Sequence, residues 1–242
     1  MKELFQGDSI MDITNRQREI LSFLSSKHFA SISEIAKDIF TSEATVRRDI
    51  KKLESMGYIK SVYGGVVLSE YHKEPIPIYL RDSENSASKE KIAFEASKLI
   101  KDNSTVIFDS SSTVRRICKH IKSKNGLTVI TNNLRVCQEL KDSNIKVICT
   151  GGTLIPKREC FVGHFAEEFI KSIKADMLFF SSQGLSENGD ITDSSEEEIS
   201  LRKEMFKSSK EQYFLCDMTK INKDFPFTLC NLRDVTDTII DK

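Results

Sequence analysis

Hydroxyl, amide and glycine residues gather in three short segments between residues 109 and 153 of the chain. The segments are residues 109–113 (DSSST), 131–133 (TNN) and 150–153 (TGGT), and each directly follows an apolar run. Hydroxyls and free backbone amides at the point where a strand passes into a helix suit phosphate. Such side chains also cap helices, which is the commoner use of any one loop. Three loops in the same position after their strands favour a binding site for a small anion.

Cationic residues form a second set that could do chemistry, between residues 43 and 56. On a helix at about 100° per residue, one narrow arc holds three apolar side chains: Val46, Ile50 and Leu53. The opposite side carries four cations: Arg47, Arg48, Lys51 and Lys52. Ala44 lies among the cations and Thr45 at their margin, so this surface could enter a DNA major groove. A charged helix face considered alone could also be exposed to solvent without binding anything.

The predicted elements before this helix would position it. Apolar spacing predicts helices over residues 17–26 and 33–40. Ser42 is placed to cap the cationic helix at its start, and Gly57 to end it in the left-handed backbone region.

A predicted hairpin follows the cationic helix. Residues 58–68 (YIKSVYGGVVL) predict two strands closed by Gly64 and Gly65, with Lys60 and Tyr63 near the tip. Three short helices followed by such a wing favour DNA binding over a solvated basic face.

Six β-rich runs alternate with helical patterns from residue 91 onward. Their bounds are 105–108, 127–131, 145–150, 177–181, 213–216 and 238–240. Several are apolar without alternation, which suits strands buried on both faces. We therefore predict an α/β domain with a mostly parallel sheet covered by helices. Because loops at the carboxyl ends of parallel strands line one crevice, the three polar segments could converge there.

Changes in composition and hydrophobic periodicity divide the chain into three parts. Residues 11–68 form a predicted α+β winged helix-turn-helix domain, residues 69–90 a linker or arm, and residues 91–242 the α/β domain. We interpret the first ten residues as dispensable, with Met11 as a natural start.

Composition limits the class of protein. Over 242 residues, 36 Lys and Arg balance 36 Asp and Glu, which excludes a uniformly basic nucleic-acid binder but allows a local basic face. No apolar run approaches the roughly 18 residues of a membrane helix. The six Cys lack a C-x-x-C pair, so we predict free thiols, no metal site, no cofactor and a cytoplasmic location. Cys149 and Cys216 lie inside apolar runs and are interpreted as small core residues.

The N-terminal residues resemble a known family. RQREIL, ISEIAKDI, SEATVRRDIKKLESMG and VYGGVV are similar to the winged helix-turn-helix of the DeoR-type transcriptional regulators. The resemblance implies that the helix after Ser42 is the recognition helix. It implies four contacts to double-stranded operator DNA: Thr45, Arg47, Arg48 and Lys51. We add candidate contacts at the helix start, on its basic face and on the wing: Ser42, Lys52, Lys60 and Tyr63.

The resemblance extends through the C-terminal part. DSSSTV, VITNN, CTGGT, FVGHFAEE, SSQGLSENGDIT, EEEISLRKEM and DMTKIN are similar to successive blocks of the DeoR-type sensor domain, whose fold is similar to ribose-5-phosphate isomerase. It implies that the effector is a sugar phosphate or a related phosphorylated metabolite. Carried over by position, the candidate effector residues are Asp109, Ser110, Ser112, Thr113, Thr131, Asn132, Gly151, Gly152 and Lys220.

Some residues depart from the family pattern. Ser111 stands where the first loop usually has glycine, so the backbone approaches a phosphate less closely. Residues 182–184 read SQG in place of A-N-G, and residues 217–220 read DMTK in place of D-S-S-K, so we expect a different effector specificity. The acidic run 196–198 predicts a solvated first helical turn, although the resemblance implies that Glu197 or Glu198 faces the crevice.

Two functions remain in competition. The first is a DNA-binding regulator, expected to be a repressor of a carbohydrate-metabolism operon, acting as a dimer or tetramer because one winged helix buries little DNA surface. The alternative is an enzyme similar to sugar-phosphate isomerases or deaminases with an appended DNA-binding domain. Where related isomerases carry catalytic acids, residues 181–185 read SSQGL, without a carboxylate. This favours the regulator, and no residue is assigned a catalytic role.

Overall fold

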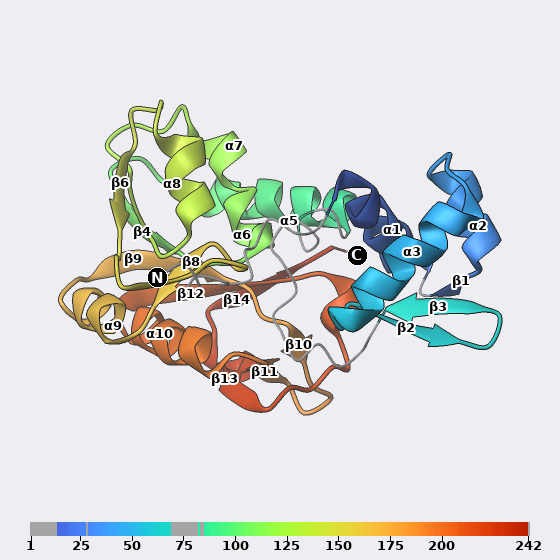
Figure 1. Ribbon diagram of the computed structural model, residues 1–242. Coiled ribbons are helices and arrows are strands. Elements are labelled where there is room, and N and C mark those ends of the chain that lie inside the picture. Colours follow the sequence, from blue (N-terminus) through green and yellow to red (C-terminus); the bar gives the residue numbers. More distant parts are fainter. Residues whose placement is uncertain (1–13, 28, 69–81, 83–84, 242) are drawn as a thin grey trace, which may run out of the picture. The chain divides into compact units, whose positions relative to one another are not determined.

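The computed structural model describes residues 14–27, 29–68, 82 and 85–241 (Figure 1). The chain separates into two compact units, residues 1–84 and 85–242, and each has a core of its own. Most of the expected linker, residues 69–90, lies outside the described residues. Its last positions differ from the expectation, because helix α5 (Ser86–Leu99) already begins there.

The described part of the N-terminal unit contains helices and a small antiparallel sheet. The helices are α1 (Asn15–Lys27), α2 (Ile32–Asp38) and α3 (Glu43–Ser55). The hairpin strands are β2 (Ile59–Val62) and β3 (Gly65–Leu68), and the short strand β1 (Phe29–Ala30) pairs with the other edge of β3. The predicted winged helix-turn-helix is confirmed, and β1 is an addition that the sequence did not predict.

Helix α3 has the two faces that its spacing predicted. Val46, Ile50 and Leu53 are all buried in the core of the unit. Ser42 caps the helix, because its Oγ accepts a hydrogen bond from the Thr45 amide at 3.3 Å. These local signals suffice to set where the helix starts and which side faces the core.

The turn of the wing lies one residue earlier than expected. Val62 pairs with Gly65, so the turn consists of Tyr63 and Gly64, and Gly64 has the positive φ of +85°. Gly65 belongs to β3, where a Cβ atom would lie 2.3 Å from the carbonyl oxygen of Ala30. The second glycine is therefore explained by the close approach of β1 and not by the turn.

A six-stranded parallel sheet forms the centre of the C-terminal unit. The strands are β4 (Thr105–Phe108), β5 (Thr128–Thr131), β6 (Lys146–Cys149), β9 (Ala175–Phe180), β12 (Ser209–Cys216) and β14 (Asp237–Ile240). Their order is β14-β12-β9-β4-β5-β6, and every neighbouring pair is parallel. All six correspond to the β-rich runs of the sequence, which confirms the predicted α/β fold.

Helices cover both faces of this sheet (Figure 1). One face packs against α5, α6 (Ser112–Arg115), α7 (Cys118–Ile121) and α8 (Leu134–Leu140). The other packs against α9 (His164–Lys171) and α10 (Glu196–Lys207). Successive residues of β9, Phe179 and Phe180, enter different cores and are both fully buried. This explains why the strands are apolar without alternation.

Several short elements were not predicted. After β4 the chain forms two short helices, α6 and α7. A hairpin of β7 (Thr153–Ile155) and β8 (Cys160–Val162) follows β6. A small antiparallel sheet consists of β10 (Gly184–Leu185), β11 (Asp190–Asp193) and β13 (Phe227–Asn231). The short helices η1 (Met218–Lys220) and η2 (Leu232–Asp234) follow β12 and β13.

Within the described residues, no helix combines the length and apolar character needed to cross a membrane.

Candidate DNA-binding face and effector site

The outer face of α3 presents the predicted cations to solvent. Arg47, Arg48 and Lys51 are exposed, whereas Lys52 and Thr45 are half-buried. Arg47 lies 3.5 Å from the Glu43 carboxylate one turn earlier, and the two side chains are 60% and 50% exposed. An exposed pair of this kind is weak and can exchange its partner for a phosphate.

A buried carboxylate holds α3 against α1. Asp49 is 5% exposed, and its oxygens accept hydrogen bonds from Arg16 Nε at 2.6 Å and Gln17 Nε2 at 2.9 Å. The hydrogen bond to Asp49, together with its charge, raises the pKa of Arg16 above its ordinary value against a smaller opposing effect of burial. Sequence analysis missed these residues, although Asp49 is the one acid among the cations of the helix interior.

The wing is attached to the same helix. The Glu54 carboxylate at the end of α3 accepts hydrogen bonds from the Ser61 amide at 2.7 Å and the Ser61 hydroxyl at 3.0 Å. Lys60 is exposed on β2, and Tyr63 is fully exposed in the turn. The contact at Ser61 therefore fixes the wing candidates relative to the cations of α3.

In the C-terminal unit, the loops after β4 and β5 meet at the carboxyl edge of the sheet. Thr131 Oγ1 donates a hydrogen bond to the Phe108 carbonyl at 2.8 Å, and the Thr150 amide donates to the Thr131 carbonyl at 3.0 Å. The structure thus brings the first and second loops into direct contact, with the third loop beside the second.

Lys220 is linked to the first loop through Ser181. Its Nζ lies 2.6 Å from Ser181 Oγ after β9, and the Ser181 amide donates to Asp109 Oδ2 at 3.1 Å. Lys220 and Gly151 follow β12 and β6, which stand four positions apart in the sheet. At about 4.8 Å per strand their starting points are about 19 Å apart, so the candidate residues span a row of loops and not one point.

Helix capping uses residues outside the candidate effector set. Ser111 Oγ accepts from the Val114 amide at 3.2 Å, and Asn133 Oδ1 from the Arg135 amide at 2.9 Å. By contrast Thr113 Oγ1 and Asn132 Oδ1 are buried and have no hydrogen-bond partner among the described residues. Buried polar atoms without a partner are uncommon and call for an explanation.

Asp109 is fully engaged with the protein. Its carboxylate accepts hydrogen bonds from the Ser111 amide at 2.9 Å and the Ser181 amide at 3.1 Å, and Arg202 Nε lies 3.1 Å away. Asp109 is 1% exposed. Asp109 therefore organises the first loop and ties it to the loop after β9.

A buried cluster of charges surrounds this loop, and sequence analysis missed most of it. Arg202 also lies 3.3 Å from Asp193, Arg158 pairs with Glu198, and Ser110 Oγ donates to Glu198 at 2.5 Å. Burial alone would lower the pKa of Arg202, but the carboxylates of Asp109 and Asp193 outweigh it and raise that pKa. Glu198 is 2% exposed, so the solvated turn expected for residues 196–198 is wrong at this position.

The third loop contains a close backbone approach, and an exposed thiol directly precedes it at the end of β6. Gly152 has φ +107°, and a Cβ atom there would lie 2.6 Å from the Val162 carbonyl. Cys149 is exposed, which corrects its interpretation as a core residue, whereas Cys216 is buried as expected. A hydrogen bond from Cys137, helped by the amides of Gly151 and Thr150 and opposed by burial, lowers the pKa of Cys149 to about 6.

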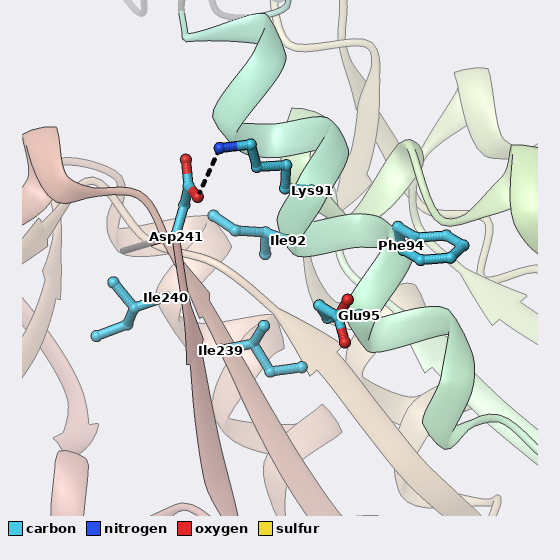
Figure 2. A pocket seen from close by; sticks show the side chains of 7 residues that line it. All are labelled: Lys91, Ile92, Phe94, Glu95, Ile239, Ile240 and Asp241. Atoms are coloured by element: carbon cyan, nitrogen blue, oxygen red, sulfur yellow. Dashed lines mark hydrogen bonds and ion pairs between the residues drawn. The ribbon is translucent and has the colours of Figure 1, made fainter.

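A shallow cavity of about 240 Å³ lies between α5 and the edge strand β14 (Figure 2). It is lined by Lys91, Ile92, Phe94, Glu95, Ile239, Ile240 and Asp241. Lys91 Nζ lies 3.4 Å from Asp241 Oδ1 across its mouth. None of the candidate effector residues lines this cavity. Among the described residues, no group of three or more His, Cys, Asp or Glu side chains could hold a metal ion.

A winged helix-turn-helix with an exposed cationic helix, in one chain with a two-faced α/β domain, defines a DNA-binding transcriptional regulator. Residues 16–71 match the DeoR-like helix-turn-helix domain, and residues 84–242 match the DeoR C terminal sensor domain. The chain belongs to the DeoR family of transcriptional regulators.

Individual relatives agree with this assignment. The HTH-type transcriptional regulator GolR of Listeria innocua is 34% identical over 85% of this chain and 82% of its own length. An L-fucose operon activator of Haemophilus influenzae is 29% identical over 94% and 91%, and a lactose phosphotransferase system repressor of Staphylococcus aureus is 28% identical over 96% and 93%. These relatives are transcriptional regulators and not enzymes, so the enzyme alternative is set aside.

Solved structures give a weaker likeness. Ribose 5-phosphate isomerase A of Methanocaldococcus jannaschii superposes with a TM-score of 0.43 at 15% identity, over 57% of this chain and 55% of that chain.

Proposed function

We propose that this chain represses a carbohydrate-metabolism operon and that a phosphorylated sugar bound in the sensor domain controls its affinity for operator DNA. The observation that carries the effector part is a pair of buried oxygens, Thr113 Oγ1 and Asn132 Oδ1, that have no hydrogen-bond partner among the described residues. A buried polar group left unpaired costs about 1–3 kcal/mol. A polyhydroxylated ligand supplies both donors and acceptors to such atoms, and Lys220 supplies a cation for a phosphate.

The kind of operon and the sign of control rest on the relatives and on a physical argument. The names of two relatives refer to a lactose phosphotransferase system and to an L-fucose operon, which supports a sugar operon. One of them is a repressor and the other an activator. We choose repression because occupying operator DNA is by itself enough to block transcription, whereas activation requires a further favourable contact.

We further propose that the protein acts as a dimer or tetramer in the cytoplasm. One winged helix offers a single α3 to the groove, and two copies on a palindromic site multiply affinity and specificity. The cytoplasm holds the DNA of bacteria such as those that carry the relatives.

The test is a titration of labelled duplex from upstream of the chain's own gene cluster, followed by fluorescence anisotropy at one fixed salt concentration. It is repeated with ribose 5-phosphate, glucosamine 6-phosphate and fructose 6-phosphate. We expect specific binding, with at least one compound changing the operator Kd by about fivefold or more. No specific binding would remove the regulator proposal for this DNA, and binding that ignores every compound would remove the sugar-phosphate part.

A matched variant locates the response. Thr113→Val keeps the shape of the side chain and removes the hydroxyl that has no partner among the described residues. We expect unchanged operator affinity, unchanged or slightly higher stability, and loss of the response to the active compound. A normal response in Thr113→Val would show that the ligand binds elsewhere.

A further inference from the structure

The first residue of the sensor unit, Asn85, is hydrogen-bonded to the loop that carries Lys220. Asn85 directly precedes α5 and has left-handed backbone angles, φ +50° and ψ +38°. Its side-chain amide donates hydrogen bonds to Thr219 Oγ1 at 3.1 Å and Asp217 Oδ1 at 3.4 Å. These contacts join positions more than 130 residues apart in the chain.

The loop on the other side of these bonds is tightly organised. Asp217 is 1% exposed, caps η1 and accepts hydrogen bonds from the amide and hydroxyl of Thr219. Lys220 Nζ lies 3.8 Å from Asp217 Oδ2 and 2.6 Å from Ser181 Oγ. Burial raises the pKa of Asp217, but Lys220, Thr219 and Lys89 outweigh it and lower that pKa. Asp217 is therefore a buried carboxylate whose charged form is stabilised by Lys220, Thr219 and Lys89.

Lys89 adds a second cation to this place from the same helix as Asn85. It lies one turn into α5, is 4% exposed, and acts electrostatically on Asp217. Asn85 is thus hydrogen-bonded to the carboxylate that follows β12, and the charge of Lys89 acts on the same carboxylate.

The chain that connects the sensor unit to the DNA-binding unit joins α5 at Asn85. On the basis of the proposed function, we propose that Asn85 is a positioning residue. It couples the binding of an anionic effector at Lys220 to the start of α5, and through α5 to the connecting chain. An anion that draws Lys220 away from Asp217 and Ser181 removes one of the two cations that act on Asp217 and leaves Lys89 of α5 as the other. The Asp217 and Thr219 acceptors of the Asn85 amide then move, and the start of α5 follows. Such a ligand has different affinities for the two states, which is the condition for control.

The test separates coupling from binding with two variants of neighbouring residues. Asn85→Gly keeps the left-handed backbone without strain and removes the amide. Ser86→Ala is the matched control, since Ser86 is exposed at the start of the same helix. For each protein, the operator Kd is measured with and without the panel compound that acts on the wild type, chosen from ribose 5-phosphate, glucosamine 6-phosphate and fructose 6-phosphate. The Kd of that compound is measured on the free protein by calorimetry.

We expect Asn85→Gly to bind the compound within about twofold of the wild type and to reduce the compound's effect on operator Kd by about three- to tenfold. Ser86→Ala should behave as the wild type. Because coupling is reciprocal, the effect of operator DNA on the compound's Kd should fall by the same factor, which a general loss of stability would not produce. A full response in Asn85→Gly overturns the coupling role while the proposed function stands. A wild type that responds to no compound overturns the proposed function, and this inference with it.

Discussion

Asp49 on the inner side of α3 lies 2.6 Å from Nε of Arg16 on α1, so the helix that presents the cations is held by one carboxylate on its opposite side. Arg16 is partly exposed, whereas Asp49 and its second partner, Gln17, are buried. The acidic and basic side chains of α3 therefore have different roles. The acid fixes the helix to the unit, and the cations stay available to DNA.

Replacing Asp49 should therefore destabilise the N-terminal unit. Asp49→Ala leaves the Gln17 amide, 2% exposed, without its acceptor, and such an unsatisfied buried group costs about 1–3 kcal/mol. Urea unfolding of the full chain should show an earlier transition for this unit. Glu43→Ala, which removes an exposed carboxylate on the same helix, should leave the transition in place. Equal losses in the two variants would contradict the anchoring role of Asp49.

The N-terminal fold could be predicted because its signals are local. The cap at Ser42 and the apolar arc of Val46, Ile50 and Leu53 depend on residues within a few positions of each other. The contact of Gly65 with Ala30 and the bonds of Asp49 to α1 join residues more than thirty positions apart. No periodicity of one segment contains that information, so β1 and the anchor were missed.

Arg48 should be more important for DNA binding than cations elsewhere on the unit. It is exposed on α3 and has no ion pair with another described residue, whereas Arg47 is paired with Glu43. Arg48→Ala should weaken operator binding by about 1–3 kcal/mol, the range for a base contact. Anisotropy titrations on operator and on scrambled duplex measure the loss and its specificity.

The control for Arg48 is a cation outside α3. Lys27 lies at the end of α1, where its ammonium packs over the Phe23 ring. Lys27→Ala should change operator affinity little. Equal effects of the two substitutions would show that the N-terminal unit binds DNA by net charge and not through the outer face of α3.

In the C-terminal unit, the strands could be predicted and the charge cluster could not. The six apolar runs predict the strands of the sheet, because a strand buried on both faces has apolar residues at successive positions. No local pattern predicts that Arg158 and Arg202 are buried, since an arginine in a charged segment is ordinarily exposed. Only the folded chain shows that they are 3% and 4% exposed beside Asp193 and Glu198.

Arg202 should be essential for the stability of the C-terminal unit. It is buried between Asp109 and Asp193, and Arg202→Met leaves two carboxylates without their shared counterion. Breaking a buried ion pair in this way costs about 3–5 kcal/mol. Thermal unfolding should show a lower Tm for this unit. Lys203→Met, at the exposed neighbouring position of α10, is the control and should unfold as the wild type. A small effect of Arg202→Met would mean that water reaches the cluster.

Cys149 should be the most reactive thiol of the six at neutral pH. Its pKa is lowered to about 6, chiefly by the hydrogen bond from Cys137, so the thiolate predominates above that pH. The rate of alkylation by iodoacetamide should rise as the pH passes through about 6 and level off above it. Burial raises the pKa of Cys216 to about 11 and that of Cys230 to about 12, so these thiols should react slowly at pH 7. Mass spectrometry of the alkylated peptides gives the rate at each position.

Two substitutions of Cys137 identify the cause of this reactivity. Cys137→Ala removes the donor, so the pKa of Cys149 should rise toward that of an ordinary thiol and the alkylation profile should shift to higher pH. Cys137→Ser keeps a hydroxyl donor at the same position and should preserve much of the lowered pKa. If both substitutions leave the profile unchanged, the backbone amides of Thr150 and Gly151 alone stabilise the thiolate. If the wild type already reacts with the profile of an ordinary thiol, neither Cys137 nor these amides stabilise the thiolate in solution, and the third loop is arranged differently there.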